Sequence, residues 1–201
     1  MDFNDIYQRM KFEAYEISAD ERTQLTDYLK KAGSTSRLES NAALLVFCYS
    51  SDPFPQNVEL VRKFLAHQTE DYVRSAAVTG LYRIWRLSTP SDIDDLQGLL
   101  ALWSVESRYD SSLAAIGCAF NLMHRLQDRR LSAALLQLLE TLHEEVMREN
   151  DLAVGLFNHA CWSAYDNWAL SNQQRRIHFD TIEEALPIYW DRRKYLLESI
   201  N

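Results

Sequence analysis

Residues 58–84 read VELVRKFLAHQTEDYVRSAAVTGLYRI, and this stretch contains the clearest structural pattern in the chain. Apolar residues in its first half are three or four positions apart, at Val58, Val61, Phe64 and Leu65. This spacing places them on one face of a helix. An acidic turn follows, and the second half is rich in small and apolar residues. The stretch therefore predicts two consecutive helices joined by a short turn.

The second helix of this predicted pair contains a motif of small residues that recurs along the chain. The segment Ser75–Gly80, SAAVTG, aligns with Ser112–Gly117, SLAAIG, and shorter matches occur at Asn41–Leu45 and Leu152–Gly155. Small side chains allow neighbouring helices to approach closely, and a spacing of roughly 34–38 residues is typical of helical repeats. The recurrence predicts four helix pairs, at about 20–50, 57–87, 91–126 and 131–170.

The rest of the chain also favours helices. Only 5 Gly and 4 Pro occur in 201 residues, fewer than the many tight turns of a β-sandwich or barrel would need. Ser18 and Glu21 have the spacing of a capping box, and acidic residues after Pro90 and Ser91 suit a helix start. No segment alternates with period two for long enough to indicate a strand. The chain is predicted to be all-α.

Both ends of the chain are predicted to be helical caps of a single domain, residues 1–201. Residues 1–16 would cover the first helix pair, and residues 173–201 would form two helical segments split by Pro187. Repeat proteins need atypical terminal elements of this kind, because the ends of a stacked core must face water.

The stretch 58–84 resembles a HEAT repeat, in which an apolar first helix and an acidic turn precede the pattern Val-Arg-x-Ala-Ala and a Leu. The resemblance implies that Arg74 lies in a ladder between repeats, and it implies core positions at Val73, Ala76, Ala77 and Leu81. It also implies a right-handed stack of antiparallel helix pairs, a HEAT-like α-solenoid, with helical caps at both ends. The other three pairs lack the Val-Arg dipeptide and match only loosely.

The charge of the chain is evenly distributed and negative. There are 21 Lys and Arg against 29 Asp and Glu, a net charge of −8, and each quarter of the chain contributes −2. Nonspecific nucleic-acid binding needs cations that replace phosphate counterions, so direct binding to nucleic acid is not expected. An acidic protein attracts basic partners instead. The charge therefore predicts a basic protein partner.

The three cysteines indicate a reducing compartment. Cys48, Cys118 and Cys161 are odd in number, far apart and set in apolar helical segments, which predicts buried free thiols. The N-terminal residues lack the basic and apolar regions of a signal peptide, and no apolar run approaches the roughly 18 residues of a membrane helix. We therefore expect a cytoplasmic protein that does not associate with membranes.

Motifs of catalysis are missing from the sequence. His143–Glu144–Glu145 begins like a zinc-protease helix, but the second His is absent, and the other histidines have no partner at metal-ligand spacing. Five scattered glycines cannot form a phosphate-binding loop. We expect no enzymatic activity, no catalytic residue, no metal and no cofactor.

Partner-binding residues are predicted on the second helices of the pairs and near the turns. Aromatic residues with polar neighbours are typical of interface hot spots, and the offsets between repeats place His159 beside Asn121. The predicted concave row is Tyr82, Trp85, Asn121, His124, His159, Trp162 and Asp166. The predicted acidic contacts are Glu70, Asp71, Glu106, Asp110, Glu149, Asp151 and Asp166. The alternative is that Trp85 and Trp162 belong to the core and that the remaining residues form an ordinary surface.

Three functions remain in competition. Size, charge and fold are similar to those of small all-helical bacterial immunity proteins, which would block a cognate toxin whose nuclease-like active site is basic. The second candidate is a general HEAT-repeat adaptor or assembly factor. The third is an enzyme on a HEAT-like fold, similar to the DNA glycosylases or bilin lyases. The missing basic groove argues against a glycosylase, and the cysteine and aromatic pattern does not single out a lyase.

Overall fold

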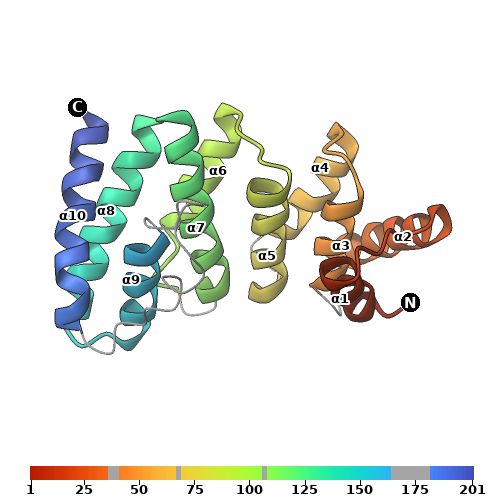
Figure 1. Ribbon diagram of the computed structural model, residues 1–201, viewed down its shortest axis with the longest axis horizontal. Coiled ribbons are helices and arrows are strands. Elements are labelled where there is room, and N and C mark those ends of the chain that lie inside the picture. The colour runs from red at the N-terminus through yellow and green to blue at the C-terminus, as the bar shows by residue number, and fades with distance from the viewer. Residues whose placement is uncertain (36–40, 67–68, 106–107, 164–181) are drawn as a thin grey trace. The chain divides into compact units, whose positions relative to one another are not determined.

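The computed structural model describes residues 1–35, 41–66, 69–105, 108–163 and 182–201 (Figure 1). The helices are α1 (Phe3–Phe12), α2 (Ala19–Thr35), α3 (Ala42–Ser50), α4 (Pro55–Arg62), α5 (Asp71–Val78), α6 (Pro90–Leu100), α7 (Tyr109–Leu126), α8 (Arg129–Val146), α9 (Asp151–Ser163) and α10 (Ile182–Ile200). A 3₁₀ turn, Lys63–Leu65, follows α4, and a π-helical segment, Thr79–Ile84, continues α5. No strand occurs in the described ranges. The predicted all-α class is confirmed for them.

The chain divides into two compact units, which are described separately. Unit 1 comprises Met1–Leu87 and unit 2 comprises Ser88–Asn201. Unit 1 contains α1 to α5 with the π-helical segment, and unit 2 contains α6 to α10. The predicted single domain spans both units.

In unit 1, α1 and α2 both pack against α3. Ile6 of α1 is buried, and the ring of Phe3 lies 4.8 Å from that of Tyr28 on α2. The predicted capping box before α2 is confirmed, because the Glu21 backbone N–H donates to Ser18 Oγ at 3.2 Å and the Ser18 N–H donates to Glu21 Oε2 at 2.8 Å. These reciprocal hydrogen bonds fix the start of α2.

The capping box makes the stability of unit 1 depend on pH. Hydrogen bonds from Ser18 and Tyr15 lower the pKa of Glu21 from its ordinary value of 4.5. A carboxyl group whose pKa is lowered on folding stabilises the protein above that ordinary value and loses the contribution as the pH falls through its folded pKa. We expect Glu21→Gln to be less stable than the wild type at pH 7, with the difference shrinking below about pH 4. Thermal unfolding of both proteins across this range checks it. A difference that stays constant with pH would contradict the assignment.

The second half of the HEAT-like stretch is helical and buried. The predicted core positions are confirmed, since at most 4% of each side chain is exposed at Val73, Ala76, Ala77 and Leu81. The π-helical segment packs against α3 at Gly80, where an added Cβ would lie 2.5 Å from Cys48 Sγ. Burial raises the pKa of the Cys48 thiol well above its ordinary value, so this cysteine is an inert core residue.

Arg74 is 1% exposed, and it forms hydrogen bonds to residues at the start of its own helix and before it. Its guanidinium donates to Asp71 Oδ1 at 3.0 Å and to the backbone oxygens of Ala66 and Thr69. The buried cation therefore joins the start of α5 to the end of the preceding 3₁₀ turn. The HEAT resemblance implied a position between repeats instead.

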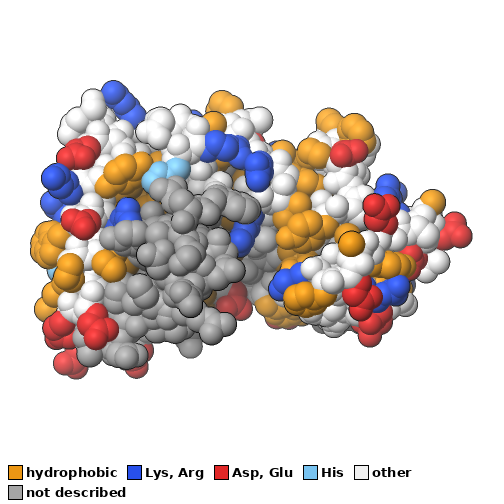
Figure 2. Space-filling model, viewed as in Figure 1, with side chains coloured by type: hydrophobic (Ala, Val, Ile, Leu, Met, Phe, Trp, Pro, Cys, Tyr) orange, Lys and Arg blue, Asp and Glu red, His pale blue; other side chains and the backbone are white. Residues whose placement is uncertain are grey.

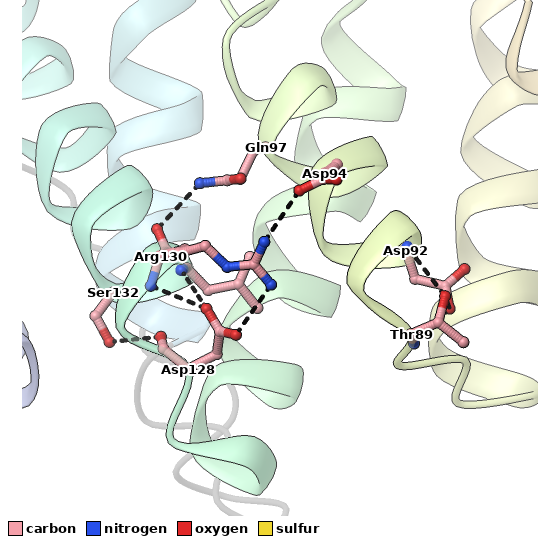
Figure 3. A network of polar contacts seen from close by, with 8 residues as sticks. Thr89, Asp92, Asp94, Gln97, Asp128, Arg130 and Ser132 are labelled. Carbon is pink, nitrogen blue, oxygen red and sulfur yellow. Dashed lines mark hydrogen bonds and ion pairs between the residues drawn. The ribbon is translucent and has the colours of Figure 1, made fainter.

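In unit 2, a network of polar contacts joins α6 to the start of α8 (Figure 3). The Arg130 guanidinium lies between Asp94 of α6, at 3.2 Å, and Asp128, at 3.4 Å, while Gln97 donates to the Arg130 carbonyl oxygen. The first helix of the unit begins at Pro90, one residue before the predicted pair. Its N-cap is Thr89, which forms a capping box with Asp92.

Two further contacts order the remaining helices of unit 2. Tyr109 on the first turn of α7 packs onto Gly155 of α9, where an added Cβ would overlap the tyrosine hydroxyl. Helices α8 and α10 run in opposite directions, because Arg129 at the start of α8 bonds to Asn201, whereas Glu140 near its end bonds to Arg193. Pro187 lies inside α10. The predicted break at Pro187 is therefore wrong: α10 continues through this exposed proline and packs against α8 along its length.

Candidate functional site

The two residues of unit 1 that were predicted for the concave row, Tyr82 and Trp85, take part in the packing of unit 1 instead. The Tyr82 side chain is 1% exposed, so its predicted surface position is corrected to a core position. Tyr82 lies in the π-helical segment, whose wider turn differs from the regular helix that the repeat offsets assumed. Trp85 is half-buried, and its indole N–H donates to the backbone oxygens of Cys48 at 2.8 Å and Ser51 at 2.9 Å. These hydrogen bonds cap the end of α3. They agree with the alternative prediction that Trp85 belongs to the core.

Of the two predicted acidic contacts in unit 1, one already has a structural role. The Asp71 carboxylate is bound to the buried Arg74, so its charge is neutralised within the turn. Its neighbour Glu70 is exposed and its side chain makes no capping hydrogen bond. Of these two carboxylates, only Glu70 could therefore pair with a basic group of a partner protein.

The described members of the predicted polar row in unit 2 lie on α7 and α9. Asn121 is exposed on α7, and His124, one turn further on, lies 3.0 Å from the Tyr195 hydroxyl of α10 through its Nδ1. His159 is half-buried on α9. Helices α7 and α9 pack against each other, and Tyr109 of α7 contacts Gly155 of α9, while the placement of His159 beside Asn121 stays a prediction.

Three predicted acidic residues do lie at one end of unit 2. The contact between Tyr109 and Gly155 puts the first turns of α7 and α9 at the same end. The start of α10 is also there, because α10 runs opposite to α8. We name as the acidic end the exposed carboxylates of these first turns together with Glu144, in the last turn of α8, and Glu149, in the loop that follows it: Asp110, Glu144, Glu149, Asp151, Glu183 and Glu184. Figure 2 shows Asp and Glu side chains gathered at the lower left, where α8 ends and α10 begins.

Part of this acidity has a structural explanation. Acidic side chains in the first turn of a helix interact favourably with its dipole, and Asp110, Asp151, Glu183 and Glu184 occupy first turns. Of the other two, Glu149 lies in the loop between α8 and α9 with a left-handed φ of 61°, and Glu144 lies in the last turn of α8. The helix dipole therefore explains four of the six carboxylates, and a binding role needs a further feature.

That feature is a pair of exposed apolar side chains at the same end, which the predicted site did not contain. Met147, at the end of α8, is 65% exposed, and Trp190 of α10 is 55% exposed. Trp190 lies near the end of α8, with its ring centroid 6.1 Å from that of His143. Large exposed apolar residues ringed by charged residues are characteristic of protein interfaces. The sequence offered no local signal for them, because the position of Trp190 near the end of α8 depends on the packing of α10 on α8.

The aromatic rings beneath Trp190 are closely packed. His143 stacks on Tyr189 with 4.3 Å between centroids and an interplanar angle of 10°, and the buried Phe157 of α9 lies 5.7 Å from Tyr189. Burial is the main cause that raises the pKa of Tyr189, and it also raises the pKa of Cys161 to about 12. Tyr189 and Cys161 are therefore neutral at pH 7 and serve the core.

The single cation of the α8–α9 loop is held by its neighbours. Arg148 is paired with Glu145 and lies 3.9 Å from Glu144, while Asn150 donates to Glu145 at 3.1 Å. The hydrogen bond from Asn150, followed by that from Arg148, lowers the pKa of Glu145. The loop is thereby ordered with the Glu145 carboxylate ionised at neutral pH.

The remaining predicted residues lie outside the described part of the chain: Glu106, Asp166 and the side chain of Trp162. Among the described residues, no group of three His, Cys, Asp or Glu could hold a metal ion. In the same ranges, none of the helices is both long enough and apolar enough to cross a membrane.

Fold and site together define an acidic, all-α protein with carboxylates and two exposed apolar side chains at one end of unit 2. Comparison of the chain with protein-family models, with curated proteins and with solved structures gave no match. The function is therefore inferred from the chemistry of the chain itself.

Proposed function

We propose that this chain is a non-enzymatic protein-binding module that recognises a basic partner through the acidic end of unit 2. The observation that carries the proposal is that exposed Met147 follows α8, that exposed Trp190 lies against His143 near the end of α8, and that the carboxylates of the acidic end lie at the same end of unit 2. Apolar anchors supply most of the affinity of an interface, and surrounding charges select and steer the partner. The net charge of −8 favours the same class of partner.

Within this class we favour an immunity protein that binds a cognate toxin in the cytoplasm and blocks a basic, nuclease-like active site. An active site that holds nucleic acid must be positive, and exposed carboxylates can occupy it in place of phosphates. The proposed framework is a HEAT-like α-solenoid, supported by the helix pairs and by the buried core of the stretch 58–84. A general adaptor with another basic partner is supported by the same surface, and the identity of the partner separates the two.

The experiment compares two variants that change the net charge equally. Glu149→Lys/Asp151→Lys reverses two carboxylates of the acidic end. Asp20→Lys/Asp27→Lys reverses two exposed carboxylates of α2 in unit 1. Each substitution adds +2, so both variants have a net charge of −8 + 4 = −4. Tagged wild type and variants are used to recover partners from the native cell, and the affinity for any stoichiometric partner is then measured.

We expect the wild type and the α2 variant to bind the partner equally, and the acidic-end variant to bind about tenfold more weakly or worse. A partner with a toxin domain, whose nuclease activity the wild type inhibits, supports the immunity protein. Another basic protein supports the adaptor. Equal binding by all three proteins, or a partner without a basic surface, would contradict the proposed site.

A further inference from the structure

The edge of unit 2 where α8 meets α10 specifies how the proposed partner is bound, and this inference rests on the proposed function. We name it the α8–α10 edge, formed by residues 140–149 at the end of α8 and residues 183–194 at the start of α10. The two helices lie side by side and antiparallel, fastened by the ion pair between Arg193 and Glu140 at 2.7 Å. Trp190 and Met147 project from this edge with more than half of each side chain exposed.

Trp190 is held in place before any partner arrives. Its ring makes edge contacts with Tyr189, at 4.7 Å between centroids, and with His143, at 6.1 Å. These two rings are stacked on each other and backed by the buried Phe157. An aromatic side chain that is already ordered loses little conformational entropy on binding, so more of its contact energy appears as affinity. Trp190 therefore has the properties of an anchor residue.

The charges around Trp190 indicate what can cover it. The α8–α10 edge contains seven carboxylates against four Lys and Arg, counted over residues 140–149 and 183–194. Two of those cations, Arg148 and Arg193, are paired with Glu145 and Glu140, and outside these two ion pairs the edge has five carboxylates and two cations, Arg192 and Lys194. A second copy of this chain would place like charges in excess opposite each other, which is unfavourable. A basic segment would instead meet an excess of carboxylates along the edge.

We propose that the α8–α10 edge is the docking surface for a basic amphipathic segment of the partner protein. An apolar side chain of that segment packs between Trp190 and Met147, and its flanking Lys and Arg residues pair with carboxylates of the edge. The occupant is thus a basic polypeptide and not a second copy of this chain. Trp190 is the residue on which its affinity depends most.

The test uses synthetic peptides and the full chain. The probe is a peptide of Lys and Leu at the spacing of an amphipathic helix, compared with a Lys and Ala peptide and with a Glu and Leu peptide of the same length. Binding is measured by calorimetry at low salt for the wild type, Trp190→Ala, Trp190→Phe and Phe54→Ala. Phe54 is a matched control, because it is 54% exposed and lies in unit 1.

We expect the wild type and Phe54→Ala to bind the Lys and Leu peptide equally, and Trp190→Ala to bind it about tenfold more weakly or worse. Trp190→Phe, which keeps an aromatic ring, should lie between them. The peptides that lack either Leu or Lys should bind the wild type more weakly. Circular dichroism of each variant verifies that it remains folded.

Several results would overturn the inference. They are equal binding of the Lys and Leu peptide by the wild type and Trp190→Ala, no preference over the Glu and Leu peptide, or no binding at all. Self-association of the wild type that Trp190→Ala abolishes would show that the edge binds a second copy of this chain.

The same variants distinguish failure of this inference from failure of the proposed function. If Trp190→Ala still binds the natural partner while Glu149→Lys/Asp151→Lys does not, the α8–α10 edge is not the docking surface and the proposed function stands. If the wild type recovers no basic partner from the native cell, the proposed function is contradicted, even if the Lys and Leu peptide binds.

Discussion

Replacing Asp71 by Lys is expected to lower the free energy of unfolding by about 3 kcal/mol. Arg74 is buried, and Asp71 supplies the carboxylate that neutralises it at 3.0 Å. The substitution would leave the guanidinium without this partner and add a second cation beside it. This loss of unfolding free energy is at the lower end of the range for a broken buried ion pair, because 18% of the Asp71 side chain is exposed. Denaturant unfolding followed by circular dichroism measures the change.

The neighbouring substitution Glu70→Lys provides the control. It makes the same charge change one residue earlier, but Glu70 is exposed and its side chain forms no cap. Its cost should stay below about 1 kcal/mol, the size of a lost interaction with the helix dipole. Equal destabilisation by the two variants would contradict the structural role assigned to Asp71. Asp71 is therefore unsuitable for a charge reversal aimed at partner binding.

Replacing Gly80 by Ala is expected to destabilise unit 1 by about 1–3 kcal/mol, the usual cost of overpacking a core. The added methyl group would lie 2.5 Å from Cys48 Sγ, where α3 meets the π-helical segment. Gly98→Ala is the matched control, because Gly98 is exposed in α6 and nothing lies within 4 Å of an added Cβ. Ala at that position should stabilise the protein by about 0.5–1 kcal/mol, since it replaces Gly in a helix interior.

A double-mutant cycle identifies the cause of the Gly80 effect. If the clash is with the sulfur atom, Gly80→Ala should cost less in a Cys48→Ala background than in the wild type, and the two substitutions should be coupled. Additive effects of Gly80→Ala and Cys48→Ala would contradict the proposed contact.

Local patterns predicted the helices well, because their determinants are neighbours in sequence. The capping box of Ser18 and Glu21 forms, and the predicted segment 91–126 corresponds to α6 and α7 with one residue of difference at its start. The pairing of Asp71 with Arg74 was not predicted, although their i, i+3 spacing on a helix would allow it. Pro187 shows the converse error: a helix-breaking residue was given more weight than the packing of α10 on α8.

The candidate site could be predicted only in part. Asp110, Glu149 and Asp151 were identified from charge and position near turns, and the structure brings them to one end of unit 2. Tyr82 was misplaced, and it lies in the π-helical segment, which differs from the regular helix that the repeat offsets assumed. Trp190 was not among the predicted site residues. Its exposure depends on how α10 packs against α8, a contact between segments far apart in sequence.

Hydrogen–deuterium exchange of the wild type, with and without the partner recovered from the native cell, tests the central claim most directly. Backbone amides buried at an interface exchange more slowly in the complex. We expect slowed exchange in segments 143–151 and 183–197, which contain the end of α8, the start of α9 and most of α10, with unit 1 unchanged. Protection confined to unit 1, or no change in these segments, would contradict the claim that this protein binds its partner at the acidic end.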